Sequence, residues 1–254
     1  MLGATGKLGT MLRRFWTLEN TLWQAQRPIP GVQDCDILRD SVGLAALLSK
    51  ADIALCLAWT LNTKGGTFGT NLALIQAILH ATPIAAHLFF ASSAAIYGDN
   101  TSCPHETSPL DPRTEYARAK VAVEACAGAS PHRTTCLRIR NVAGCDAILG
   151  GWYPGMTVDA RGLKIPPRSY IRPQSFAKTI CRLLTLPAPP SLHVAAPGRV
   201  EMRELLNATH LAWQPRAPSR DVIWEGNLNT RVLQEFMPLE AREGISADWH
   251  AAAI

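Results

Sequence analysis

Three glycines at the start of the chain, followed at once by a helical pattern, constrain the fold more than any other feature. Gly3, Gly6 and Gly9 are three residues apart, and apolar side chains recur at helical spacing from Lys7 to about Leu18. A glycine turn that opens a helix lets the backbone approach a phosphate closely, and the helix amino terminus offers N–H groups and a positive dipole end. The start of the chain therefore predicts a binding site for the pyrophosphate of a dinucleotide.

Strand and helix patterns alternate through the first part of the chain. The expected strands are Leu22–Gln26, Gly31–Asp34, Asp52–Ala58, Ile84–Ala91 and Thr134–Arg140, and the expected helices are Val42–Ser49, Phe68–His80 and Glu115–Ala127. This alternation predicts an α/β fold of the Rossmann type, a doubly wound parallel sheet with helices on both faces. In such a sheet the ligand lies at the carboxyl ends of the strands.

Proline and glycine divide the second half of the chain into short pieces. A helix at Gln174–Leu184 and a strand at Leu192–Ala196 are still expected there. We therefore expect a dinucleotide-binding domain at residues 1–147. A small C-terminal substrate-binding lobe is expected at residues 148–254, interleaved with the last elements of the sheet.

Tyr116 and Lys120 are four residues apart at the start of an expected helix, so their side chains share one face. The Lys120 ammonium is expected to lower the pKa of the Tyr116 phenol, which lets the phenol exchange a proton with a substrate hydroxyl. Ser93, at the end of an apolar strand, is expected to hold the same oxygen. Each motif alone is common in ordinary turns and solvated helices, but their order and separation favour a catalytic site.

Composition excludes several other classes of protein. The chain of 254 residues is 47% hydrophobic and 18% charged, and its net charge of +5 is spread along the sequence, which argues against a nucleic-acid partner. No apolar run reaches the length of a membrane span, and no signal-peptide pattern is present, so a cytoplasmic location is expected. Seven scattered cysteines and seven histidines show no metal-ligand spacing, so no metal is expected.

The glycine turn, Ser93 and the Tyr116–Lys120 pair together resemble the extended short-chain dehydrogenase/reductases, specifically the NAD(P)-dependent epimerase/dehydratase family. The resemblance extends over most of the chain. It implies Tyr116 as the catalytic acid/base, Lys120 as its electrostatic partner and a ribose contact, and Ser93 as a catalytic residue that positions the substrate. It also implies that the cofactor contacts Gly3, Thr5, Gly6, Lys7, Leu8, Gly9, Asp36, Ile37, Leu57, Ala58, Asn71, Lys120, Asn141 and Val142.

Two departures from the family pattern refine these expectations. NAD enzymes of the family usually carry an acid for the adenosine ribose after the second strand, whereas this chain has Gln26 and Arg27. A guanidinium can pair with a 2′-phosphate, so Arg27 is expected to bind the cofactor and NADP is expected to be preferred over NAD. Members that dehydrate nucleotide sugars carry Asp-Glu where this chain has Ala94-Ala95, so 4,6-dehydration is not expected.

A third departure concerns the first strand. Only Met1 and Leu2 precede the glycine turn, whereas strands usually run about 5–6 residues. A shortened central strand is expected to leave buried N–H and C=O groups of its neighbours without partners. We therefore expect that the start codon is assigned too late and that Met1 is an internal residue of an apolar strand.

These features favour an NAD(P)-dependent oxidoreductase or epimerase that acts on a sugar or nucleotide-sugar-like small molecule. The resemblance also implies a homodimer formed through the helix that carries Tyr116. Six basic residues of the second half could bind an anionic group or could simply be solvated surface charges: Arg161, Lys164, Arg168, Arg172, Arg199 and Arg220. The alternative is a non-catalytic dinucleotide sensor, which would have no use for Ser93, Tyr116 and Lys120.

Overall fold

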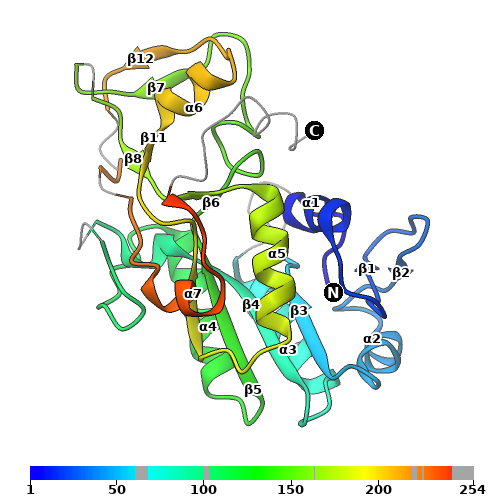
Figure 1. The fold of residues 1–254 in the computed structure, drawn as a ribbon. Helices are drawn as coiled ribbons and strands as arrows, with labels where there is room; N and C mark the ends of the chain where they lie inside the picture. The colour runs from blue at the N-terminus through cyan, green and yellow to red at the C-terminus, as the bar shows by residue number, and fades with distance from the viewer. Residues whose placement is uncertain (61–67, 100–102, 163, 219–221, 225, 242–254) are drawn as a thin grey trace. The chain divides into compact units, whose positions relative to one another are not determined.

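The structure, a computed structural model, describes residues 1–60, 68–99, 103–162, 164–218, 222–224 and 226–241 (Figure 1). The chain divides into two compact units. The first comprises residues 1–96, 112–138 and 184–192, and the second comprises residues 97–111, 139–183 and 193–254. The chain thus passes between the units several times, and a single division at residue 147 stays a prediction.

The first unit is built on the expected α/β sheet. Four strands lie in the order β10 (Ser191–Val194), β5 (Arg133–Ile139), β4 (His87–Ser93) and β3 (Ile53–Cys56), the last residues of β10 and β5 belonging to the second unit (Figure 1). β3 and β4 are parallel, with Ile53 opposite His87 and Cys56 opposite Phe90. The residues of β4 are buried or half-buried throughout, as in a strand covered on both faces. The Rossmann-type fold expected from the sequence is confirmed.

Helices α2 (Ser41–Leu48), α3 (Phe68–Ala81) and α4 (Glu115–Gly128) follow the strands as the sequence predicts. α3 packs against α4 and α2, and α4 packs against β4. Their apolar faces meet the sheet in one core, which includes Leu44, Ile78, Leu88, Phe90 and Val123. Burial of such side chains contributes on the order of 1.5–3 kcal/mol each and fixes the ends of α4 and β4 relative to one another.

The first helix is shorter than the sequence predicts. α1 spans Lys7–Phe15, and Trp16 already has an extended backbone, with φ −75° and ψ 137°. The indole Nε1 of Trp16 donates a hydrogen bond to the hydroxyl of Thr21 at 2.8 Å, which holds the chain in a turn after the helix ends. The expectation of a helix to Leu18 was therefore wrong by one turn.

The strand ahead of the glycine turn is reduced to one residue, Leu2, which pairs in parallel with both Gln24 and Cys56. Gln24 belongs to β1 (Gln24–Ala25), which pairs in parallel with β2 (Gln33–Asp34). Leu2 donates to the Leu55 carbonyl at 2.8 Å and accepts from the Leu57 N–H at 2.9 Å. Leu2 therefore joins β1 to β3, but this strand position in the sheet is only one residue long.

The second unit contains short strands and helices around its own core. Among its described residues, the strands form three pairs: β6 (Asn141–Val142) with β9 (Tyr170–Ile171), β11 (Val200–Glu201) with β8 (Pro167–Arg168), and β12 (Gln214–Arg216) with β7 (Thr157–Asp159). Its helices include α6 (Met202–Ala208), α7 (Arg231–Phe236) and α5 (Pro173–Leu184), whose last residue belongs to the first unit. Buried Leu149, Val158, Tyr170 and Leu205 are part of its core.

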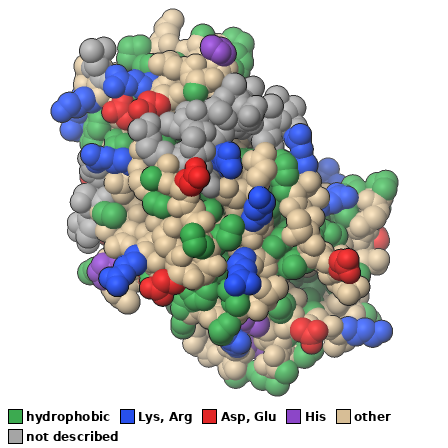
Figure 2. Space-filling model, in the orientation of Figure 1, with side chains coloured by type: hydrophobic (Ala, Val, Ile, Leu, Met, Phe, Trp, Pro, Cys, Tyr) green, Lys and Arg blue, Asp and Glu red, His purple; other side chains and the backbone are tan. Residues whose placement is uncertain are grey.

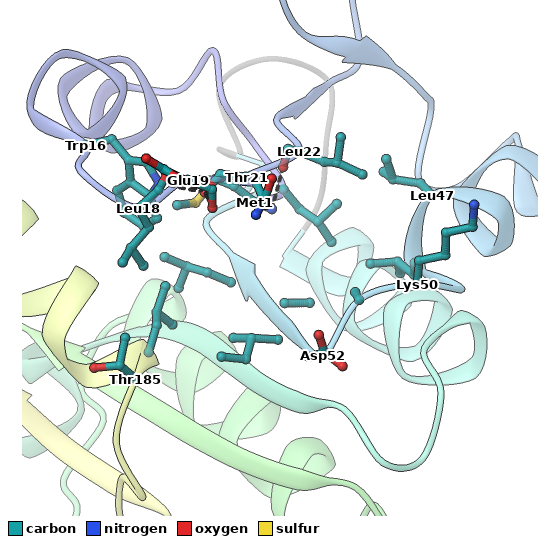
Figure 3. A pocket seen from close by; sticks show the side chains of 18 residues that line it. Met1, Trp16, Leu18, Glu19, Thr21, Leu22, Leu47, Lys50, Asp52 and Thr185 are labelled. Carbon is teal, nitrogen blue, oxygen red and sulfur yellow. Dashed lines mark hydrogen bonds between the residues drawn. The ribbon is translucent and has the colours of Figure 1, made fainter.

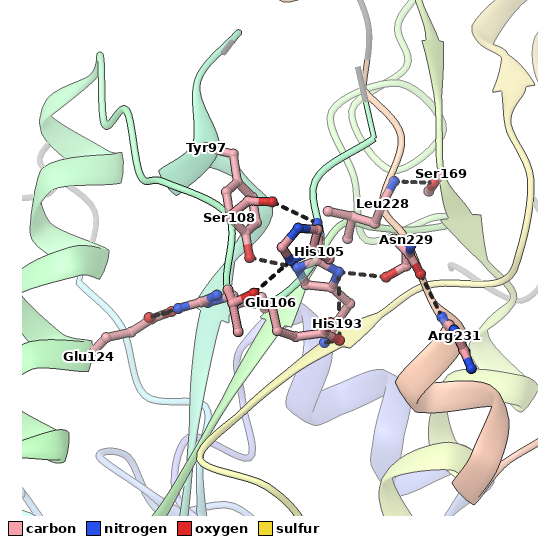
Figure 4. A network of polar contacts seen from close by, with 12 residues as sticks. Tyr97, His105, Glu106, Ser108, Glu124, Ser169, His193, Leu228, Asn229 and Arg231 are labelled. Carbon is pink, nitrogen blue, oxygen red and sulfur yellow. Dashed lines mark hydrogen bonds and ion pairs between the residues drawn. The ribbon is translucent and has the colours of Figure 1, made fainter. Parts of the chain in front are cut away.

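A buried polar network connects distant segments of this second unit (Figure 4). The ring of His193 is fully buried, its Nε2 lying 2.7 Å from the Tyr97 hydroxyl and its Nδ1 2.7 Å from the Asn229 carbonyl oxygen. The backbone N–H of His193 donates to the carboxylate of Glu106 at 3.0 Å. Because both ring nitrogens and the backbone N–H of His193 have partners, this buried histidine does not cost the free energy of unpaired polar groups.

The visible surface carries no concentrated basic region. Figure 2 shows Lys and Arg side chains distributed among acidic and apolar ones on the face that it draws. Within the described ranges, no helix combines the length and hydropathy that a bilayer span requires.

Candidate active site

The glycine turn is shaped by close backbone contacts. Gly3 has φ +89°, a conformation that L side chains rarely adopt, and a Cβ there would lie 2.7 Å from the backbone nitrogen of Ala58. A Cβ at Gly9 would collide with the Gly3 carbonyl oxygen. Gly3 and Gly9 are thus required by the packing of the turn, which brings the amino terminus of α1 to the end of β3.

The residues that open α1 are accessible to a ligand. Thr5, Gly6 and Lys7 are exposed and Leu8 is half-buried. Gly6 is the N-cap residue, and the first turn contains no acidic side chain. The N–H groups and the positive dipole end of α1 could therefore bind a phosphate, as the sequence predicts.

The segment around Asp36, which is expected to lie beside the adenine of the cofactor, is held by internal hydrogen bonds. The Asp36 carboxylate accepts from the backbone N–H groups of Leu38 and Arg39 at 3.0 and 3.2 Å and from the Gln26 amide at 2.9 Å. Burial acts to raise the pKa of Asp36, but these hydrogen bonds outweigh it and the pKa is lowered. Arg27 follows Gln26 as an exposed residue, while Ile37 is buried. Asp36 therefore fixes the turn at Leu38 and Arg39, while binding of the cofactor by Arg27 stays a prediction.

Asn71 holds the segment that follows β3. From the buried face of α3, its amide oxygen accepts from the Thr60 N–H at 2.7 Å and its amide nitrogen donates to the Thr60 carbonyl at 3.0 Å. This pair of bonds fixes the backbone after Leu57 and Ala58, the residues expected to line the cofactor. Asn71 therefore supports the segment that is expected to line the cofactor, and its own contact with the cofactor stays a prediction.

Ser93, Tyr116 and Lys120 are brought together in the first unit. Ser93 is the last residue of β4, and Tyr116 is the second residue of α4, whose N-cap Thr114 accepts from the Ala117 N–H at 3.1 Å. The Ser93 and Tyr116 hydroxyl groups share a hydrogen bond. Lys120, one turn further, is 4% exposed, and its Nζ donates to the Ala91 carbonyl at 2.6 Å. The three expected catalytic side chains therefore converge at the carboxyl end of β4.

The pKa of Tyr116 differs from the sequence prediction. We expected the Lys120 ammonium to lower it, but burial raises the pKa of Tyr116, and the hydrogen bond with Ser93 offsets this only in part. Burial also lowers the pKa of Lys120 to about 7, so at neutral pH the amine carries only part of a charge. The expected lowering was wrong because the sequence pattern gives the spacing of the two groups and not their desolvation.

Trp59 is a member of the site that sequence reasoning missed. Its ring centroid lies 3.5 Å from the Lys120 Nζ, and its ring meets that of Tyr116 at 5.6 Å with an angle of 78° between planes. The ring thus covers the amine and contacts the phenol at once. Its position directly after Leu57 and Ala58, at the end of a central strand, was the available signal.

A buried ion pair supports the same helix and was also missed. The Arg138 Nη2 lies 2.7 Å from a carboxylate oxygen of Glu124, and the Ser92 hydroxyl donates to the other oxygen. Glu124 is one turn beyond Lys120, and its charge acts to raise the pKa of Lys120 against desolvation. The Lys-x-x-x-Glu spacing was the sequence signal.

Other expected residues belong to the second unit. Asn141 is in β6 opposite Tyr170, followed by Val142 opposite Ile171, and Asn141 lines a cavity of about 380 Å³ together with Arg168 and other residues. The Arg168 guanidinium donates to the carbonyls of Pro167, Ile223 and Trp224, which makes it part of the unit's framework. Arg220 lies outside the described residues.

Comparison with known proteins agrees with this geometry. The family model described as NAD dependent epimerase/dehydratase family matches residues 1–149. A search of curated protein sequences found no match.

Solved structures share the fold over nearly the whole chain. RMD from Pseudomonas aeruginosa, complexed with NADPH, is 19% identical with a TM-score of 0.75, covering 99% of this chain and 97% of its own. UDP-glucose 4-epimerase from Brucella ovis, in complex with NAD, is 15% identical with a TM-score of 0.78, covering 98% and 97%. TunA, an NAD dependent NDP-hexosamine 5,6-dehydratase involved in tunicamycin biosynthesis, is 16% identical with a TM-score of 0.77, covering 99% and 96%.

Proposed function

Because the chain belongs to the NAD-dependent epimerase/dehydratase family, we propose that it is an NAD(P)-dependent reductase or epimerase acting on a carbinol or keto carbon of a sugar or nucleotide-sugar-like substrate. The observation that carries the proposal is the convergence of the Ser93 and Tyr116 hydroxyl groups above the buried Lys120. A protein that only binds a dinucleotide has no need of this arrangement.

Tyr116 is proposed to move the proton that accompanies hydride transfer. The nicotinamide supplies or accepts the hydride when it is bound. Burial keeps the pKa of Tyr116 raised, so the phenol is protonated at neutral pH and can donate to the oxygen of a keto substrate. Ser93 shares a hydrogen bond with that phenol, which supports a role for Ser93 in orienting the same substrate oxygen.

4,6-Dehydration of a nucleotide sugar is not part of the proposed activity. Ala94 and Ala95 follow Ser93 in the short 3₁₀ helix Ala94–Tyr97 and offer no group that could donate or accept a proton. Loss of water from a sugar needs such an acid and base beside the reacting carbons. Formation of a 4-keto-6-deoxy product from a nucleotide-hexose would contradict this part of the proposal.

NADP is proposed as the preferred cofactor. Arg27 is exposed just beyond β1, where Gln26 is engaged with Asp36 and no acid takes its place. The resemblance to the family extends this proposal to a homodimer formed through α4 and to a cytoplasmic enzyme.

The test is direct. Purified protein with NADPH or NADH is offered a panel of keto-sugars, aldehydes and nucleotide sugars, and oxidation of the cofactor and interconversion of the sugars are followed. Turnover of any member supports the proposal. Binding of a cofactor without turnover of any member would favour a dinucleotide sensor, and binding of neither cofactor would contradict both functions.

A further inference from the structure

Charged side chains are solvated around the first unit's cavity, but one is desolvated in the second unit. A cavity of about 320 Å³ lies beneath Met1 in the first unit, and most of the side chains that line it are apolar (Figure 3). Its charged side chains, Glu19, Lys50 and Asp52, are exposed to solvent and need no bound counter-ion. The second unit differs, because the guanidinium of Arg140 is desolvated there.

Arg140 lies between β5 and β6, directly before Asn141, and its side chain is half-buried. Its Nε donates to the Gly226 carbonyl oxygen at 3.1 Å. Within the described part of the chain this is its only side-chain hydrogen bond, and no carboxylate there pairs with it. The two Nη amino groups of Arg140 are therefore a pair of donors that no described residue uses.

A second guanidinium, that of Arg168, stands close to Arg140. Gly226 packs between the two side chains, and a Cβ on this glycine would collide with Arg140 Nη2 and with Arg168 Cδ. Burial, and after it the charge of Arg168, lower the pKa of Arg140 to about 10. Charged groups that are removed from water are normally paired with an opposite charge. This pair of arginines therefore lacks a negative charge on the side of Arg140.

The hydrogen bonds around the two guanidiniums fix their orientation. Arg168 donates to three backbone carbonyls, and the Nε of Arg140 is held by Gly226. The Gly226 carbonyl also accepts from the Ser169 N–H at 3.0 Å, so it keeps a donor without Arg140. Satisfying this carbonyl thus does not account for Arg140, whereas a fixed pair of Nη donors is preorganised for a ligand.

We propose that Arg140 binds a carboxylate group of the substrate through its two Nη amino groups. Two parallel N–H groups of a guanidinium match the two oxygens of one carboxylate in a plane. A phosphate presents three oxygens and up to about two charges, more than this single pair of donors can match. The neighbouring charge of Arg168 adds to the attraction for an anion.

The inference rests on the proposed function in one respect, because it identifies the carboxylate as part of that enzyme's substrate. The substrate is then an acidic one, a sugar acid or a smaller hydroxy or keto acid. Binding of the carboxylate itself is a property of the second unit and can be measured without turnover.

The test measures thermal unfolding of the full chain with sodium D-glucuronate or sodium L-lactate, and with D-glucose at equal ionic strength as the neutral counterpart. At least one carboxylate is expected to raise the unfolding midpoint of wild type by about 3 °C or more over D-glucose. Arg140→Met should reduce this rise to less than about 1 °C. Lys178→Met, an exposed change on α5, is the matched control and should respond like wild type.

The unfolding midpoint without ligand separates a binding role from a structural one. Arg140→Met removes a desolvated charge beside Arg168 and leaves Gly226 its bond from Ser169. The ligand-free variant should therefore unfold at the same temperature as wild type or at a higher one. A midpoint lower by more than about 4 °C would assign a structural role to Arg140 and contradict the proposal.

Equal midpoints of wild type with both carboxylates and with D-glucose would overturn the proposal, as would equal rises in wild type and Arg140→Met. A rise with inorganic phosphate and none with either carboxylate would also overturn it. These measurements involve neither cofactor nor turnover, so their failure leaves the proposed function standing. Absence of turnover in the substrate panel would likewise leave the binding result unchanged.

Discussion

The Lys120 Nζ lies 3.5 Å from the centroid of the Trp59 ring, and the same ring meets Tyr116 edge to face. The amine is therefore covered on one face by the indole and bonded on another to the Ala91 carbonyl. We expect a ribose that contacts Lys120, as the family resemblance implies, to displace the Trp59 ring from the amine. Several properties of the site follow from this relationship.

Replacing Trp59 is expected to change cofactor binding in a defined direction. Trp59→Ala removes the ring that a ribose must displace, together with a cation–π contact of about 0.5–2 kcal/mol. We expect NADPH to bind roughly threefold to tenfold more tightly, measured by titration of cofactor fluorescence. Trp213→Phe, in the second unit, serves as the control and should leave the Kd unchanged. Equal binding by Trp59→Ala would contradict displacement of the ring, and weaker binding would show that the ring itself contacts the cofactor.

Lys120 is expected to make stability depend on pH. Its pKa is lowered to about 7 in the folded protein from 10.5, so between these values the unfolded chain binds the additional proton. The unfolding free energy therefore rises as the pH increases above about 7. Below pH 7 Lys120 is protonated in both states, and the folded protein is destabilised by the whole cost of burying its charge. Between pH 7 and 8.5, the unfolding free energy of wild type should rise relative to that of Lys120→Met, as measured by urea titrations. A pH-independent difference would contradict the lowered pKa.

Glu124 is expected to be structurally important. Glu124→Gln leaves the Arg138 guanidinium buried without its carboxylate and should cost about 3 kcal/mol of stability, measured by urea denaturation. It also removes a charge that acts to raise the pKa of Lys120. Glu115→Gln, an exposed change on the same helix, is the matched control and should cost less than about 0.5 kcal/mol. Equal effects of the two changes would mean that the ion pair contributes little.

Arg27 is expected to discriminate between the two cofactors. A charge-assisted hydrogen bond to a 2′-phosphate is worth about 1.5–3 kcal/mol, so Arg27→Ala should weaken NADPH binding by roughly tenfold or more. NADH, which lacks that phosphate, should bind as before. Arg118→Ala on α4 tests whether loss of any positive charge has the same effect. Tighter binding of NADH than NADPH by the wild type would refute the NADP preference.

The sequence predicted the sheet and the glycine turn because both depend on local patterns. Periodicity located α3, α4 and α5 within one residue of their observed ends, and the need for glycine at Gly3 follows from its approach to Ala58. Spacing on a helix also predicted that Tyr116 and Lys120 would share a face.

What the sequence could not predict depends on long-range packing. The extent of burial around Lys120, and therefore the direction of the Tyr116 pKa shift, results from strands and loops far away in the chain. Trp59 and Lys120 are far apart in the sequence, so no local pattern predicts their contact. The cavity beneath Met1 arises from segments as distant as Thr21 and Thr185.

The central claim is that Tyr116 is the proton donor and acceptor of an NAD(P)-dependent enzyme. The decisive measurement compares wild type and Tyr116→Phe, both for cofactor Kd and for turnover of a substrate found in the panel. Loss of the hydroxyl should leave the Kd within about twofold and lower kcat by about a hundredfold or more, the usual size of an acid/base contribution. Near-full turnover by Tyr116→Phe would contradict the account.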